Sequence, residues 1–194
     1  MTRRGALLGA LALAACDGGP KVEPVSLPVA ALRGTADPLW QAAEIASFAL
    51  AMRPQNLEGK PAEAAFAVML YEYAAAEAGT VMLYEYAAAE AGNGRLHDQN
   101  PGRLMREGRP HLRAAAGLIG EAEPQRVIDA LWSVTEALRR GDEAASRAAF
   151  SAPVFRGSPE VPRAALSRLV VSPQAVRGLR ALREALARDQ LSPR

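Results

Sequence analysis

Alanine constrains the fold of this 194-residue chain more than any other feature of its sequence. It is the strongest helix former, because it loses no side-chain conformational entropy in a helix. Although 49% of the residues are hydrophobic, only 5% are aromatic, and the alternation of β-branched and aromatic residues that is typical of strands is nearly absent. The sequence therefore predicts one all-α domain, an irregular bundle of about six to eight helices.

The first sixteen residues, MTRRGALLGALALAAC, have the three parts of a secretory signal peptide. Arg3 and Arg4 give it a positive start, residues 5–15 are apolar, and small residues precede Cys16. The apolar stretch is too short to span a bilayer, for which a helix needs about 20 residues. This segment therefore predicts export from the cytoplasm.

The segment Leu13-Ala14-Ala15-Cys16 resembles the lipobox of bacterial lipoproteins, which is a leucine, two small residues and the cysteine that becomes lipidated. The resemblance covers residues 1–16 only. It implies removal of residues 1–15, acylation of Cys16 with fatty acids such as palmitate, and a membrane anchor in the cell envelope that faces the periplasm. Two or more acyl chains are needed for stable anchoring.

Two further resemblances concern export and sorting. Asp17 resembles the residue that retains enteric lipoproteins in the inner membrane, which favours the inner over the outer membrane. Residues 2–8 (TRRGALL) are similar to a twin-arginine export signal, but Ala6 stands where that signal favours phenylalanine. Twin-arginine export and general secretory export therefore both stay open.

Residues 17–36 contain three prolines and three glycines and show no helical period, which predicts a flexible tether ahead of the helical domain, residues 37–194. The formal net charge of +2 comes from Arg3 and Arg4, since 21 basic and 21 acidic side chains remain without them. Acidic side chains predominate before residue 95 and basic ones after it. This balance argues against nucleic acid as a partner.

No residue pattern predicts a catalytic site, a metal site or a bound cofactor. Cys16 is the only cysteine, which excludes a disulfide within the chain. His97 and His111 are the only histidines, and neither lies in a zinc-ligand spacing. A Gly-x-Ser-x-Gly motif, as in hydrolases that use a serine nucleophile, is also missing.

Capping and helix-breaking residues predict where the helices begin and end. The first helix begins at Asp37-Pro38 and ends at Arg53-Pro54, with an apolar stripe of Trp40, Ile45, Phe48 and Met52. The second runs from Pro61 to Gly79 and exposes its glutamates, Glu72 among them. Later helices are expected from Pro101 to Gly108, Pro110 to Gly120, Val127 to Arg140, Asp142 to Phe150, from Pro162, and from Pro173.

The segment VMLYEYAAAEAG at residues 68–79 recurs without change at residues 81–92. At 100° per residue, this step of 13 residues turns the second copy by about 220° in a straight helix. The chain therefore either breaks at Gly79-Thr80 and packs again, or carries extra turns that project from the domain. A continuous helix stays open, because an interior glycine costs only about 1 kcal/mol. We expect residues 80–92 to be surplus to the fold.

The densest basic stretch predicts a contact with an anionic surface, either lipid headgroups or an acidic partner, through Arg103, Arg106, Arg109, His111 and Arg113. The alternative is a solvated arginine face. The predicted function is a non-enzymatic binding or scaffolding role in the envelope, and the second hypothesis is an enzyme accessory or a hydrolase. An exposed apolar patch would favour the binding role, and a cleft with convergent carboxylates or histidines of perturbed pKa would favour the enzyme.

Overall fold

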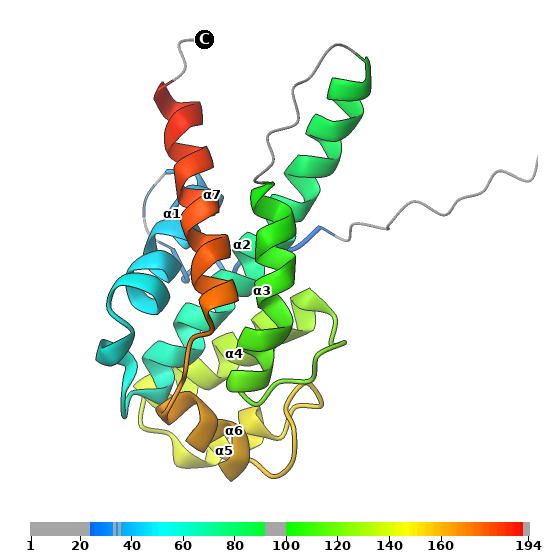
Figure 1. Ribbon diagram of the computed structural model, residues 1–194. Helices are drawn as coiled ribbons and strands as arrows, with labels where there is room; N and C mark the ends of the chain where they lie inside the picture. Colours follow the sequence, from blue (N-terminus) through cyan, green and yellow to red (C-terminus); the bar gives the residue numbers. More distant parts are fainter. Residues whose placement is uncertain (1–23, 33, 35, 92–99, 192–194) are drawn as a thin grey trace, which may run out of the picture.

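The computed structural model describes residues 24–32, 34, 36–91 and 100–191, with the backbone alone for residues 80–91 and 189–191. Within these ranges the chain forms seven α-helices, a π-helical turn and a 3-10 turn, and no strand (Figure 1). The all-α prediction is confirmed. In chain order the elements are α1 (Pro38–Ala46), η1 (Ser47–Met52), η2 (Pro54–Leu57), α2 (Pro61–Ala91), α3 (Pro101–Ala115), α4 (Pro124–Arg139), α5 (Glu143–Phe150), α6 (Glu160–Ser167) and α7 (Pro173–Leu191).

The helices begin where the capping residues predicted. Asp37, Asn100 and Asp142 each accept a hydrogen bond from the backbone N–H three residues later, at 2.8 to 2.9 Å. These bonds satisfy donors that the first turn of a helix leaves without a partner. Three starts differ. α4 begins at Pro124 and not at Val127, α6 begins at Glu160, two residues before the predicted Pro162, and Pro110 begins no helix because it lies inside α3.

The central helix is α2, with α1, α3, α4 and α6 packed around it (Figure 1). Between residues 64 and 79 it is buried on almost every side, as expected for a helix that is apolar all round. The prediction that Gly79 ends this helix is wrong, because the helix continues to Ala91. The second copy of the repeat thus extends α2, and in Figure 1 this extension rises past the start of α3.

The buried face of α1 is not the predicted one. Ala42, Ala43 and Ala46 are completely buried, whereas Ile45, Phe48 and Met52 of α1 and η1 are 38%, 54% and 56% exposed. Alanine side chains let α1 approach α2 closely, and the distance between packed helices depends on the size of the side chains at the contact. The large apolar side chains consequently lie on the outer face.

α3 is one helix, although two were predicted. Gly108 and Pro110 both lie inside it, and Gly108 marks the place where α3 packs against α7. A Cβ atom at Gly108 would lie 2.7 Å from the Cα atom of Ala175, and one at Gly178 of α7 would lie 3.0 Å from the carbonyl oxygen of Leu104. Both glycines therefore serve the close packing of the two helices, not their ends.

Part of the predicted tether lies against the domain. The backbone N–H of Ser26 donates to Oε1 of Gln125 at 2.8 Å, and Nε2 of Gln125 donates to the carbonyl of Ser26 at 3.2 Å. Ala31 is buried, and Val25 and Leu27 pack against the core. These contacts hold residues 25–31 beside α2 and α4, so this stretch does not act as a free spacer. Among the helices that the structure describes, none combines the length and the hydrophobicity that a membrane span requires.

Candidate functional site

The five residues predicted to contact an anionic surface all lie on α3, but they do not face the same way. Arg103, Arg106 and His111 are exposed, and Arg103 forms an ion pair with Glu107 one turn later. Arg113 is 2% exposed, and the Arg109 side chain is 18% exposed. The predicted surface therefore does not include Arg113, and Arg109 contributes little to it.

Arg113 and Arg109 converge on Glu72 of α2, which is completely buried. Nε and Nη2 of Arg113 donate to the two carboxylate oxygens of Glu72, at 2.9 and 2.7 Å. Nη1 of Arg113 donates to the carbonyls of Gly120 and Ala122, both at 2.6 Å. The prediction that Glu72 lies on a solvated face is wrong, since α3 and the following loop enclose it.

This network ties α2 to α3 and to residues 120–122. Nε of Arg109 lies 3.3 Å from Oε2 of Glu72, so two arginines share one carboxylate. Burial lowers the pKa of Arg109, although the charge of Glu72 opposes that shift. Burial also raises the pKa of Tyr71 above its ordinary value, and the Tyr71 hydroxyl donates to the carbonyl of Met105 at 2.9 Å. Nε of Arg109 is buried without a hydrogen-bond partner, but Nη2 of the same residue donates to the carbonyl of Glu72 at 3.4 Å. The bonds of Arg109, Arg113, Glu72 and Tyr71 are all to the protein itself, which gives the network a structural role.

The outer face of α1 and η1 carries three large exposed apolar side chains, Ile45, Phe48 and Met52, which we call the α1 stripe. Their spacing of three and four residues places them on one side of a helix. Sequence reasoning missed this surface, because it assigned the same residues to the core. The signal that points to it is the set of alanines at positions 42, 43 and 46, which supplies the buried face instead.

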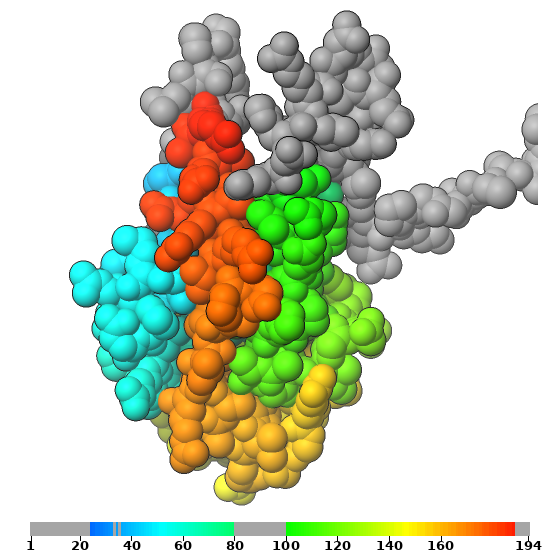
Figure 2. All heavy atoms as spheres, viewed as in Figure 1, coloured from blue at the N-terminus to red at the C-terminus, as the bar shows by residue number. Residues whose placement is uncertain are grey.

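Helix α7 provides a basic edge beside the α1 stripe. Arg183 donates from Nε to Oε1 of Glu44 at 2.6 Å, and its Nη1 lies 3.8 Å from the sulfur of Met52. Arg177 and Arg180 on the same helix are exposed. Figure 2 shows η1 and its neighbours in cyan beside α7 in orange and red, on one face of the molecule.

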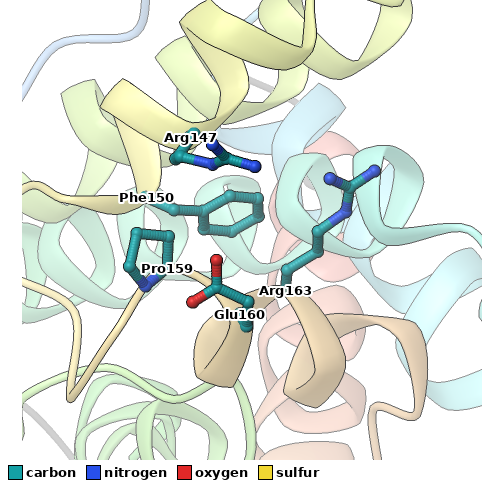
Figure 3. A pocket seen from close by; sticks show the side chains of 5 residues that line it. All are labelled: Arg147, Phe150, Pro159, Glu160 and Arg163. Atoms are coloured by element: carbon teal, nitrogen blue, oxygen red, sulfur yellow. The ribbon is translucent and has the colours of Figure 1, made fainter.

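A small hollow of about 110 Å³ lies between α5 and α6 (Figure 3). Its lining includes Glu160, whose pKa is lowered by the backbone N–H of the same residue and by the Ser158 hydroxyl. Arg163, on its rim, donates two hydrogen bonds to Glu143, at 2.6 and 2.8 Å. Ligand pockets are typically about 300–1,000 Å³ in volume. Glu160 and Arg163 are thus engaged locally and the hollow is small, so we assign it no substrate.

In the parts of the chain that the structure describes, no three histidine, cysteine, aspartate or glutamate side chains gather closely enough to hold a metal ion. The predicted lipidation residue Cys16, the sorting residue Asp17 and His97 lie outside the described residues. Comparison with known protein families, with curated proteins and with solved structures finds no match to this chain.

Proposed function

We propose that the mature chain is a lipid-anchored protein of the cell envelope whose helical domain has a non-enzymatic role in binding or scaffolding. The proposal of an anchor is supported by the lipobox-like segment that ends at Cys16, behind a positive and then apolar N-terminus. The proposal of a binding role is supported by the fold, because the domain presents three large apolar side chains to solvent.

The α1 stripe is the observation that carries the binding role. Single exposed apolar residues are common on protein surfaces and need no explanation. Three at 38–56% exposure on one side of α1 and η1, with Nη1 of Arg183 on α7 3.8 Å from the sulfur of Met52, form an apolar patch with a charged edge. Such a patch favours the binding role over the enzyme hypothesis. The hollow of Figure 3 does not favour an enzyme. The pKa of Glu160, its carboxylate, is lowered by hydrogen bonds from its own backbone N–H and from Ser158, at the start of α6.

The anchor is tested by replacing Cys16 with serine. A serine oxygen cannot form the thioether, so we expect the variant to lose labelling by a palmitate analogue and to keep residues 1–15. Ala15→Gly is the matched control, because it keeps a small residue next to Cys16 and should label normally. A Cys16→Ser variant that is still labelled and processed would contradict the anchor.

The binding role is tested by placing a photo-reactive amino acid at position 48, in the α1 stripe, in growing cells. Position 144 is the control, because Ala144 is exposed and lies on α5. We expect cross-linked products, to protein or to lipid, from position 48 and few from position 144. Equal yields from the two positions, or none from either, would mean that the α1 stripe is not a contact surface.

A further inference from the structure

We propose that the α1 stripe and the arginines beside it dock on the anionic surface of a lipid bilayer, so that the helical domain lies on the membrane that carries its anchor. This inference rests on the proposed function, which supplies the anchor. It differs from the sequence-based prediction, because the arginines involved are those of α7 and the end of η1, not those of α3.

The chemistry of this face suits the interface of a bilayer. The segments 38–53 and 173–188 carry five arginines and only two glutamates, and one of those glutamates, Glu44, is paired with Arg183. The arginines are Arg53, Arg177, Arg180, Arg183 and Arg188. Apolar side chains on such a face enter the boundary between headgroups and acyl chains, while the basic side chains stay among the phosphates.

Two of these arginines are available for an outside partner. Arg177 and Arg180 are exposed, and within the described residues neither forms a hydrogen bond or an ion pair through its side chain. They lie on α7, the helix that packs against η1, and Arg183 of the same helix reaches the α1 stripe, with its Nη1 3.8 Å from the sulfur of Met52. This complementarity identifies the occupant as a negatively charged surface with an apolar interior.

The size of the α1 stripe also favours a bilayer over a protein partner. A stable protein interface buries about 800 Å² on each partner around a packed apolar core. Three side chains supply only a small part of such a core. An anchored domain needs only a weak contact, because the tether keeps the local concentration of the membrane surface high. The eight residues 17–24 separate the anchor at Cys16 from the part of the chain that packs on the domain. They can span at most about 29 Å when fully extended, so the domain stays within that distance of the anchor.

The experiment uses the purified lipidated chain, reconstituted into vesicles of phosphatidylcholine with or without phosphatidylglycerol. Gln55, exposed just after η1, is replaced by cysteine and labelled with a dye that responds to polarity. Since lipidation consumes the Cys16 sulfur, residue 55 carries the only free thiol. We expect a blue shift of the dye emission on vesicles with phosphatidylglycerol, a much smaller one without it, and none from a dye at Ala144→Cys.

Removing two arginines tests the charge. Arg177→Gln with Arg180→Gln should lower the ratio of docked to undocked domain about 30-fold, which is about five-fold for each arginine at a strongly anionic surface. Arg156→Gln with Arg168→Gln is the matched control, since both residues are exposed elsewhere and the net charge changes equally. Added salt should weaken docking in the parent chain.

Three results would overturn the proposal. The first is an equal blue shift on neutral and anionic vesicles, and the second is an equal loss in the two double variants. The third is a dye whose emission shows that it stays in water on both kinds of vesicle. Together with cross-links from position 48 to a protein, this result would assign the α1 stripe to a protein partner. Failure of the anchor itself looks different, because that chain would not float with the vesicles and would bind two dyes.

Discussion

Replacing Glu72 by glutamine tests whether burial makes the Glu72–Arg113 pair essential to the fold. Glutamine keeps the shape of the side chain but removes its charge. Arg113 and Arg109, whose side chains are 3% and 18% exposed, are then left without a counter-charge. Removing one partner of a buried ion pair costs about 3–5 kcal/mol. Each kcal/mol lowers the Tm of a domain this size by about 2–4 °C, so we expect a fall of about 6–20 °C.

Glu63→Gln is the matched control for this prediction. Glu63 lies on the same helix and accepts from Nε and Nη2 of Arg139, at 3.3 and 3.1 Å, through the same fork geometry. Its side chain is 49% exposed, and that of Arg139 is 38% exposed. Exposed pairs contribute about 0.2–1 kcal/mol, so the Tm should fall by no more than about 4 °C. Thermal unfolding followed by circular dichroism measures both variants, and equal shifts would refute the argument from burial.

Three other predictions concern stability. Deleting residues 80–92, which joins Gly79 to Asn93, should keep cooperative thermal unfolding; a fall in Tm of more than about 10 °C would make the second copy part of the core. Gly108→Ala should lose about 1–3 kcal/mol in urea denaturation, because its Cβ would lie 2.7 Å from the Ala175 backbone. The control Gly120→Ala, with no atom within 4 Å of its Cβ, should change by less than about 0.5 kcal/mol. Burial raises the pKa of Tyr73 to about 12 and also raises that of Tyr71, whereas the unfolded chain loses these protons near pH 10. Stability should therefore fall as the pH rises from about 10 to 12, and less so in the double variant Tyr71→Phe with Tyr73→Phe, measured by urea denaturation at each pH.

The starts of the helices were predictable because a cap is local chemistry. Asp37, Asn100 and Asp142 act on an N–H group three residues away, which a sequence window contains. The ends were less predictable, because glycine ends a helix only where the backbone turns left-handed. Gly141 does so, with φ of 68°, and it follows α4 as predicted. Gly79 and Gly108 keep a helical backbone instead. Gly79 lies within the continuous helix α2, and Gly108 lies within α3, where that helix packs against α7.

The buried faces were predicted well where leucine and valine dominate and poorly where alanine does. On α4, Val127, Leu131 and Val134 are buried as their spacing predicts. On α1 the alanines take the buried face, and the larger side chains form the α1 stripe. Burial of Glu72 was not predictable from its own helix, because its partner Arg113 stands 41 residues later in the sequence. The fold class was thus predictable from the sequence. The candidate binding face was not, because it depends on how α1, η1 and α7 pack together.

The repeat raises a question that the sequence alone leaves open, namely which of two identical copies occupies the centre of the fold. A shift of α2 by 13 residues would bring Glu85 to the place of Glu72 without changing the repeated segment. The residues before the repeat favour the first copy. Glu63 pairs with Arg139, and the Arg139 guanidinium lies 4.8 Å from the centre of the Phe66 ring. After the shift, Ala76 and Gly79 would stand at these two places, and both contacts with α4 would be lost. The first copy is therefore placed by its upstream neighbours, and a chain shortened by one copy keeps the same neighbours and the same centre.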